Sequence, residues 1–140
     1  MFKAVVVGTD GSETASVAVR QAFELVSDGQ VLHVVSGYRP ATARTVTAGG
    51  DQWIILPEDK VDSVLQEVAA QARIHGVKVE THAIRADPAT AIVRVAKEVG
   101  ADLVVVGNKG MKGAKRFLLG SVPNKVAHSA PCAVLILKTT

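Results

Sequence analysis

The chain has 140 residues, 48% of them hydrophobic and 21% charged, and a net charge of +3. This length fits one domain, residues 1–140, that can bury an apolar core. No apolar run is long enough to cross a bilayer, and the apolar N-terminal stretch is too short for a signal peptide. The single cysteine, Cys132, excludes an intrachain disulfide. We therefore expect a cytoplasmic protein that does not associate with membranes.

The basic character of the chain is concentrated near its C-terminus. All 13 acidic residues lie before residue 103, whereas 6 of the 16 Lys and Arg residues follow it. Such a local patch favours a small anionic ligand over an extended nucleic-acid surface. Phe117 is the one aromatic residue near the patch, so a stacking platform for bases is lacking and no nucleic-acid partner is expected. Four cations form its centre: Lys109, Lys112, Lys115 and Arg116.

The first third of the chain alternates apolar runs with a helical period, which is typical of a parallel α/β sheet. Residues 3–7 predict a first strand. A helix is predicted over residues 12–27, because apolar residues recur on one face and Ser12 is a good N-cap. Residues 30–36 predict the second strand.

The middle of the chain contains one segment that does not fit this alternation. Residues 38–57 show no clear periodicity, and their Thr, Ala and Gly content predicts a flexible surface loop. A lid or a dimer contact is the alternative, since the segment ends in an apolar run. A helix over residues 58–75, ended by Gly76, and a third strand over residues 78–84 follow.

The last third of the chain returns to the regular alternation. An Asp-Pro pair at residues 87–88 predicts a helix start, and Gly100 predicts its end. Residues 103–106 predict a fourth strand that is apolar at every position, as expected when both faces are covered. A short helix from about residue 121 leads to a fifth strand over residues 132–137.

The strongest local motif joins Gly107-Asn108-Lys109-Gly110 to Gly120-Ser121 across nine residues. It lies at the carboxyl end of the fourth strand, where open α/β sheets bind ligands. Glycines let backbone amides approach a ligand, and the start of a helix offers free N–H groups to an anion. The motif therefore favours a phosphate site, although a common glycine turn beside a solvated charged run is the simpler interpretation. The P-loop and the Gly-x-Gly-x-x-Gly patterns are both absent.

This motif resembles the nucleotide-binding pattern of the ATP-binding universal stress proteins. Five further stretches resemble the same family: residues 5–13, 31–34, 101–107, 118–122 and 130–136. The resemblance covers nearly the whole chain apart from residues 38–57. It implies a stress-response or signalling protein built on a Rossmann-like α/β fold. The implied sheet is open, parallel and five-stranded, in the order 3-2-1-4-5, with helices on both faces.

The resemblance also implies a site for ATP or another adenine nucleotide, AMP or cAMP. The adenosine would lie at the end of the first strand and along the second, and the ribose and phosphates in the glycine segment. This chain departs from many relatives at Gly8, where they have proline, and at Pro123, where they have Ser or Thr. The implied nucleotide-binding residues are Gly8, Thr9, Asp10, His33, Val34, Val106, Gly107, Asn108, Lys109, Gly110, Gly120, Ser121 and Val122.

Several of these residues have simpler interpretations. Asp10 could cap the first helix instead of contacting adenosine. His33 is a lone strand histidine of a kind that is usually structural, so only its backbone would serve the ligand. No His, Cys or Asp cluster has metal-ligand spacing, so we predict no metal site. Mg²⁺ or Mn²⁺ would arrive on the phosphates. Cys132 is expected to be an inert, buried thiol.

Three functions remain to be compared. Residues 107–121 contain no acid and no histidine, so we predict no catalytic residue and keep a weak ATP hydrolase only as an alternative. A dimeric module without nucleotide is disfavoured by the intact glycine motif. Pro123 removes a donor for distal phosphates, which favours AMP or cAMP over ATP. The apolar fifth strand, at residues 133–137, is expected to pair with a second copy in a homodimer.

Overall fold

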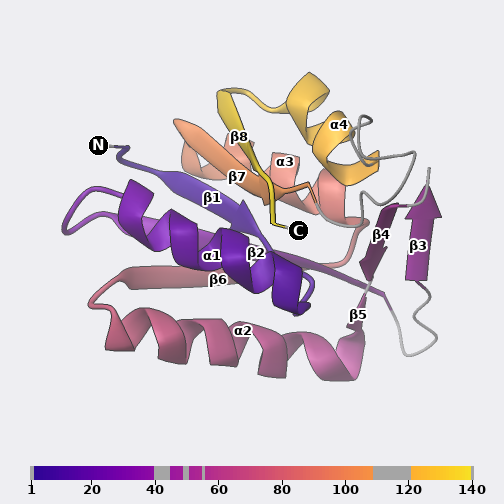
Figure 1. Cartoon of the computed structure of the whole chain (residues 1–140), viewed down its shortest axis with the longest axis horizontal. Coiled ribbons are helices and arrows are strands. Elements are labelled where there is room, and N and C mark those ends of the chain that lie inside the picture. Colours follow the sequence, from indigo (N-terminus) through magenta and orange to yellow (C-terminus); the bar gives the residue numbers. More distant parts are fainter. Residues whose placement is uncertain (1, 40–44, 49–50, 55, 109–120, 140) are drawn as a thin grey trace.

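Figure 1 shows the computed structural model, which describes residues 2–39, 45–48, 51–54, 56–108 and 121–139. Its centre is a parallel sheet in which β5, β2, β1, β7 and β8 follow one another, and β6 also pairs with β2. The six strands are β1 (Val5–Gly8), β2 (Val31–Arg39), β5 (Leu56–Pro57), β6 (Lys78–Ile84), β7 (Leu103–Gly107) and β8 (Ala133–Leu137).

The predicted order of the five long strands is confirmed, but the predicted number of strands is wrong. The order β6-β2-β1-β7-β8 corresponds to 3-2-1-4-5 in the sequence prediction. The sixth strand, β5, pairs with the last two residues of β2, Tyr38 and Arg39. It finds room there because β2 extends beyond the predicted end at residue 36, whereas its pairing with β6 ends at Gly37.

The segment after β2 is also more ordered than predicted. A hairpin of β3 (Thr45–Ala48) and β4 (Asp51–Ile54) pairs antiparallel, with Thr45 opposite Ile54 and Ala48 opposite Asp51. The prediction of a structureless loop over residues 38–57 is therefore wrong for these strands. In Figure 1 the hairpin stands beside the sheet at the end where β2 finishes.

Two helices cover each face of the sheet (Figure 1), as the sequence predicts. The pair α1 (Glu13–Leu25) and α2 (Glu58–Ile74) packs on one face, and α3 (Pro88–Val99) and α4 (Ser121–Ser129) pack on the other. Alternate strand residues supply the two cores: Val5 and Val7 face α1 and α2, and Val6 faces α3. The residues of β7 alternate between the same two cores. This strand is therefore buried on both faces, which explains why it is apolar throughout.

The predicted helix boundaries are close to those in the structure. Ser12 caps α1, with its Oγ accepting a hydrogen bond from the Ala15 N–H at 3.2 Å. The Asp87 carboxylate accepts from the Thr90 N–H at 3.4 Å at the start of α3. Gly100 ends that helix with a φ of +64°, in the left-handed region that favours glycine.

Among the helices that the structure describes, none is long and apolar enough to cross a membrane.

Candidate functional site

The loop after β1 is held by its own side chains. Thr9 and Asp10 are each only 3% exposed. The Thr9 Oγ1 accepts a hydrogen bond from the Gly11 N–H at 3.1 Å, and the Asp10 Oδ1 accepts from the Ser12 N–H at 3.0 Å. The N-cap of α1 is Ser12 and not Asp10. Asp10 instead holds the turn before the helix, through its hydrogen bond with the Ser12 N–H. The loop is thus preorganised at the carboxyl end of β1.

Two further residues, which sequence analysis did not select, fix this loop. The buried Ser36 hydroxyl donates a hydrogen bond to the Thr9 carbonyl and so connects the end of β2 to the loop. The Thr9 N–H donates to the Val35 carbonyl at 2.9 Å. Gly11 has a φ of +81°, and a Cβ there would lie 2.9 Å from the Val64 Cγ2 of α2. A Ser and a Gly at strand and turn ends were signals available in the sequence.

The carboxyl end of β7 is held against the C-terminal strand. The Asn108 N–H donates to the Leu137 carbonyl at 2.8 Å. The Asn108 Oδ1 accepts from the Thr139 N–H at 2.9 Å and from the Thr139 Oγ1 at 3.3 Å. At Gly107 a Cβ would lie 3.1 Å from the Thr139 Cγ2, so the backbone makes a close approach that a glycine permits. The Asn108 side chain therefore positions the strand end.

The structure brings the two loops to one edge of the sheet. Since β1 and β7 pair in parallel, with Val7 opposite Val105 at the end of the register, both strands finish at the same edge of the sheet. The chain leaves β1 into α1 on one face and later enters α4 on the other, which makes this edge the topological switch point of the sheet. Open α/β sheets bind ligands at such a crevice.

The remaining predicted phosphate residues lie within or beside residues 109–120, which the structure does not describe. Lys109, Gly110 and Gly120 lie outside the described residues. Ser121 begins α4, and the next two residues, Val122 and Pro123, are buried. Pro123 is in the first turn of α4, as the sequence predicts. Val106 is buried in the same core as Val122.

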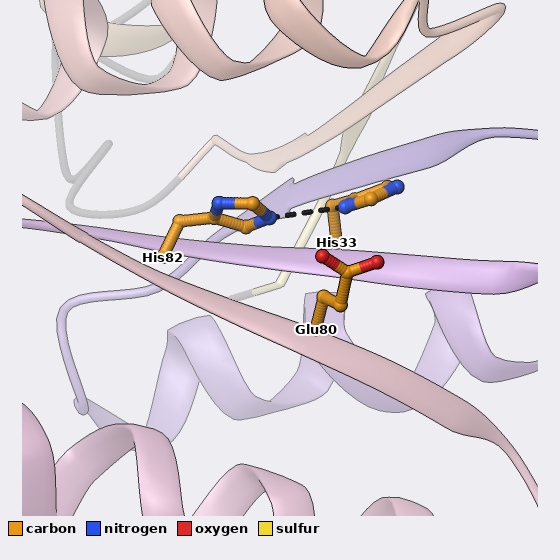
Figure 2. A group of neighbouring side chains, drawn as sticks. All are labelled: His33, Glu80 and His82. Atoms are coloured by element: carbon orange, nitrogen blue, oxygen red, sulfur yellow. Dashed lines mark hydrogen bonds between the residues drawn. The ribbon is translucent and has the colours of Figure 1, made fainter.

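The structure places His33 and Val34 on opposite faces of β2. The Val34 side chain packs in the core beneath α1 and α2. His33 is paired with Val6, two residues before the end of β1, so its side chain is not grouped with Thr9 and Asp10. Figure 2 shows its ring directed instead toward His82 of β6, with Nδ1 and Nε2 3.0 Å apart. The pKa of His33 is lowered, mainly by burial and to a smaller extent by the charge of His82. The charge of Glu80 acts in the opposite direction.

The sequence analysis did not predict this group of side chains. It found no cluster with metal-ligand spacing, yet the pairing of β2 with β6 brings His33, Glu80 and His82 together. The available signal was the Glu-x-His alternation of β6, which places both side chains on one face of that strand. The expectation of a buried Cys132 is not met, because this residue is half-buried. Burial, followed by the charge of Asp102, raises the pKa of its thiol.

A cavity opens beside the loop after β1. It has a volume of about 350 Å³, lies between α1 and α2, and includes Thr9, Gly11 and Ser12 in its wall. That volume is in the range of small-molecule sites. A groove of about 470 Å³ between α3 and α4 contains none of the predicted nucleotide residues. Among the described residues that line the first cavity, Thr9 is the one predicted nucleotide residue. The assignment of the switch-point edge therefore rests on the strand topology and the loop geometry, and not on a cavity.

An open parallel sheet whose loops diverge at the carboxyl edge defines a Rossmann-like α/β fold, a class in which ligands bind outside the carboxyl ends of the strands. The chain belongs to the Universal stress protein family, whose profile matches residues 1–138. This confirms the family resemblance of the sequence.

Two relatives and two solved structures match this chain along nearly their whole length. The universal stress protein YxiE of Bacillus subtilis is 33% identical over 150 residues, covering 99% of this chain and 100% of the relative. Rv1636 of Mycobacterium tuberculosis is 36% identical over 143 residues, covering 99% and 98%. A crystal structure of a universal stress protein in complex with cAMP has 33% identity, a TM-score of 0.77 and coverage of 99% and 98%. An Archaeoglobus fulgidus family member in complex with dAMP has 25% identity, a TM-score of 0.68 and coverage of 96% and 97%.

Proposed function

We propose that the protein binds an adenine nucleotide at the switch point between the loops that follow β1 and β7. One observation carries the proposal. The solved universal stress protein that is 33% identical to this chain, over almost all of both chains, is a complex with cAMP. The dAMP complex of a second family member agrees with it. Both ligands combine adenine with a single phosphate.

The described geometry supports this assignment at the adenosine end. Side chains that would otherwise need ordering on binding are already held, because Thr9 and Asp10 accept hydrogen bonds from the amides of their own loop. Preorganisation of this kind lowers the entropic cost of binding. We assign contacts to the end of β1, to the strand β2 (through the backbone at His33) and to the glycine motif. These residues are Gly8, Thr9, Asp10, His33, Val34, Val106, Gly107, Asn108, Lys109, Gly110, Gly120, Ser121 and Val122.

We further propose a preference for a monophosphate, AMP or cAMP, over ATP. Pro123 stands in the first turn of α4, where it offers no backbone N–H and no hydroxyl to a distal phosphate. A hydrogen bond to a charged group contributes roughly 1.5–3 kcal/mol, so its loss costs about tenfold or more in affinity. A single phosphate held nearer the glycine motif would not need that donor. If ATP binds, Mg²⁺ or Mn²⁺ would accompany its phosphates.

The proposed role is that of a non-catalytic binding module in stress response or signalling. The segment 107–121 supplies no acid or histidine that could activate water, which disfavours a hydrolase. We also propose a homodimer through β8. In the described sheet β8 pairs only with β7, so its outer backbone groups are available to a second copy.

Calorimetric titration of nucleotide-free protein with ATP, ADP, AMP and cAMP tests the proposal. We expect micromolar binding of AMP or cAMP and weaker binding of ATP. ATP that binds more tightly than both monophosphates would contradict the preference. Gly120→Val should abolish binding, because a side chain there would occupy the phosphate space, while circular dichroism remains unchanged. Gly113→Val makes the same substitution outside the glycine motif and should retain binding. Failure of all four nucleotides to bind would overturn the proposal.

A further inference from the structure

The group His33, Glu80 and His82 lies on the α3 face of the sheet, at its β2–β6 edge. In the parallel register His33 is opposite Glu80, and His82 is opposite Val35. Paired residues and those two apart share a face of a sheet, so all three side chains project on the side where Val35 packs against α3. Figure 2 shows both rings and the carboxylate converging on one point above the strands.

The geometry of this group matches the donor set of a transition-metal ion. One ligand atom from each residue lies within 4.8 Å of the others, and the two imidazole nitrogens are 3.0 Å apart. Two ligands bound to Zn²⁺ at about 2.1 Å lie about 3.0–3.5 Å apart, depending on the angle between them. The histidines already have this spacing. Glu80 is exposed, so rotation of its side chain can bring the carboxylate to the same ion.

The contact between the rings is compatible with metal binding. In the absence of an ion, one imidazole donates a hydrogen bond to the other. Moving that proton to the far nitrogen of the same ring leaves two lone pairs facing each other, and a cation between them removes their repulsion. Metal ligation requires neutral imidazoles, which is the form that the burial of His33, at 8% exposure, favours.

We propose that His33, Glu80 and His82 form a binding site for one divalent transition-metal ion of the Zn²⁺ type. Two imidazoles and one carboxylate suit Zn²⁺, whereas Mg²⁺ and Ca²⁺ prefer all-oxygen sites. Three protein ligands leave a fourth position for water or an exogenous ligand. The ion would cross-link β2 to β6, which has no other strand neighbour in the described sheet, and so stabilise that edge. The two proposed sites share His33, whose side chain would bind the ion and whose backbone is assigned to the nucleotide. The metal proposal rests on the side-chain geometry alone and does not depend on the proposed function.

Titration with ZnSO₄ of full-length protein stripped with a chelator tests this site. We expect one Zn²⁺ per chain and a rise in melting temperature, because the ion binds only the folded state. Co²⁺ in its place should give the visible bands of a tetrahedral nitrogen and oxygen site without a thiolate charge-transfer band. Glu80→Gln and His82→Ala should each weaken Zn²⁺ binding by at least about tenfold.

Matched controls identify the ligands. His128→Ala removes an exposed histidine outside the group, and Cys132→Ser removes the thiol; both should bind Zn²⁺ like the unaltered protein. Circular dichroism establishes that each variant is folded. The proposal is overturned if the unaltered protein does not bind Zn²⁺, if binding is lost in either control, or if Glu80→Gln or His82→Ala binds as tightly as the original. AMP binding by Glu80→Gln should be unchanged, so failure here and failure of the proposed function are distinguishable.

Discussion

The loop after β1 and the histidine group on β2 and β6 satisfy polar side chains in different ways. In the loop, Thr9 and Asp10 each accept a hydrogen bond from an amide two residues further along the chain. In the histidine group, the interacting rings of His33 and His82 are 49 residues apart in sequence. The loop therefore holds its shape through local contacts. The histidine group exists only because two strands pair in one register, and its side chains keep the capacity to bind something else.

The largest expected loss of stability comes from a change to the local geometry of the loop. Gly11→Ala should lower the free energy of unfolding by about 2–4 kcal/mol, because a φ of +81° strains an alanine and its Cβ would lie 2.9 Å from Val64. Gly29→Ala is the matched control, since Gly29 has a φ of +79° but no atom within 4 Å of a Cβ. It should cost only the strain, about 1–2 kcal/mol. Urea denaturation measures both values, and equal losses would show that the contact with Val64 does not matter.

A second, smaller effect should follow from removing the connection between β2 and the loop. Ser36→Ala leaves the Thr9 carbonyl without the buried hydroxyl that donates to it, and should cost about 1–3 kcal/mol. Ser63→Ala removes a hydroxyl that donates to the Lys60 carbonyl at 2.9 Å on the exposed face of α2. That control should change stability by about 0.5 kcal/mol or less. If both variants unfold at the same urea concentration, Ser36 does not hold the loop.

The contrast between local and distant contacts explains how much the sequence could predict. The five long strands and four helices were readable, because runs such as Leu103–Gly107 and caps such as Ser12 and Asp87 are local signals. The hairpin β3–β4 and the strand β5 were missed, because they lie in a segment rich in Thr, Ala and Gly that shows no clear periodicity. Of the candidate site, the residues at the sheet edge follow from motif and topology. The histidine group does not. The implied strand order places β6 beside β2, but no local pattern fixes the register that puts Glu80 opposite His33.

Asp102 has features of both regions, because its partners are backbone N–H groups, as in the loop, but are distant in sequence, as in the histidine group. Its carboxylate accepts hydrogen bonds from the N–H groups of Lys3 and Ala4, both at 3.0 Å, although these residues are nearly a hundred positions away. These contacts fasten the start of β1 beside β7. The hydrogen bond from Lys3, opposed by desolvation and aided by the bond from Ala4, lowers the pKa of Asp102 below its ordinary value of 3.8.

The sign of the pH dependence follows from that lowered pKa. The unfolded chain binds the proton more readily than the folded one, so the carboxylate stabilises the fold fully above about pH 4, and this contribution is lost as the pH falls through the folded pKa. Asp102→Asn should therefore be less stable than the original protein at pH 7, and the difference should shrink toward pH 3. Because the side chain is exposed, solvent screening limits the effect to about 1 kcal/mol.

Asp28→Asn removes the same charge from an exposed turn and controls for net charge. Urea denaturation at pH 7, 5 and 3 measures the difference. A gap between Asp102→Asn and the original protein that stays constant down to pH 3 would mean that the ionised carboxylate does not hold the start of β1.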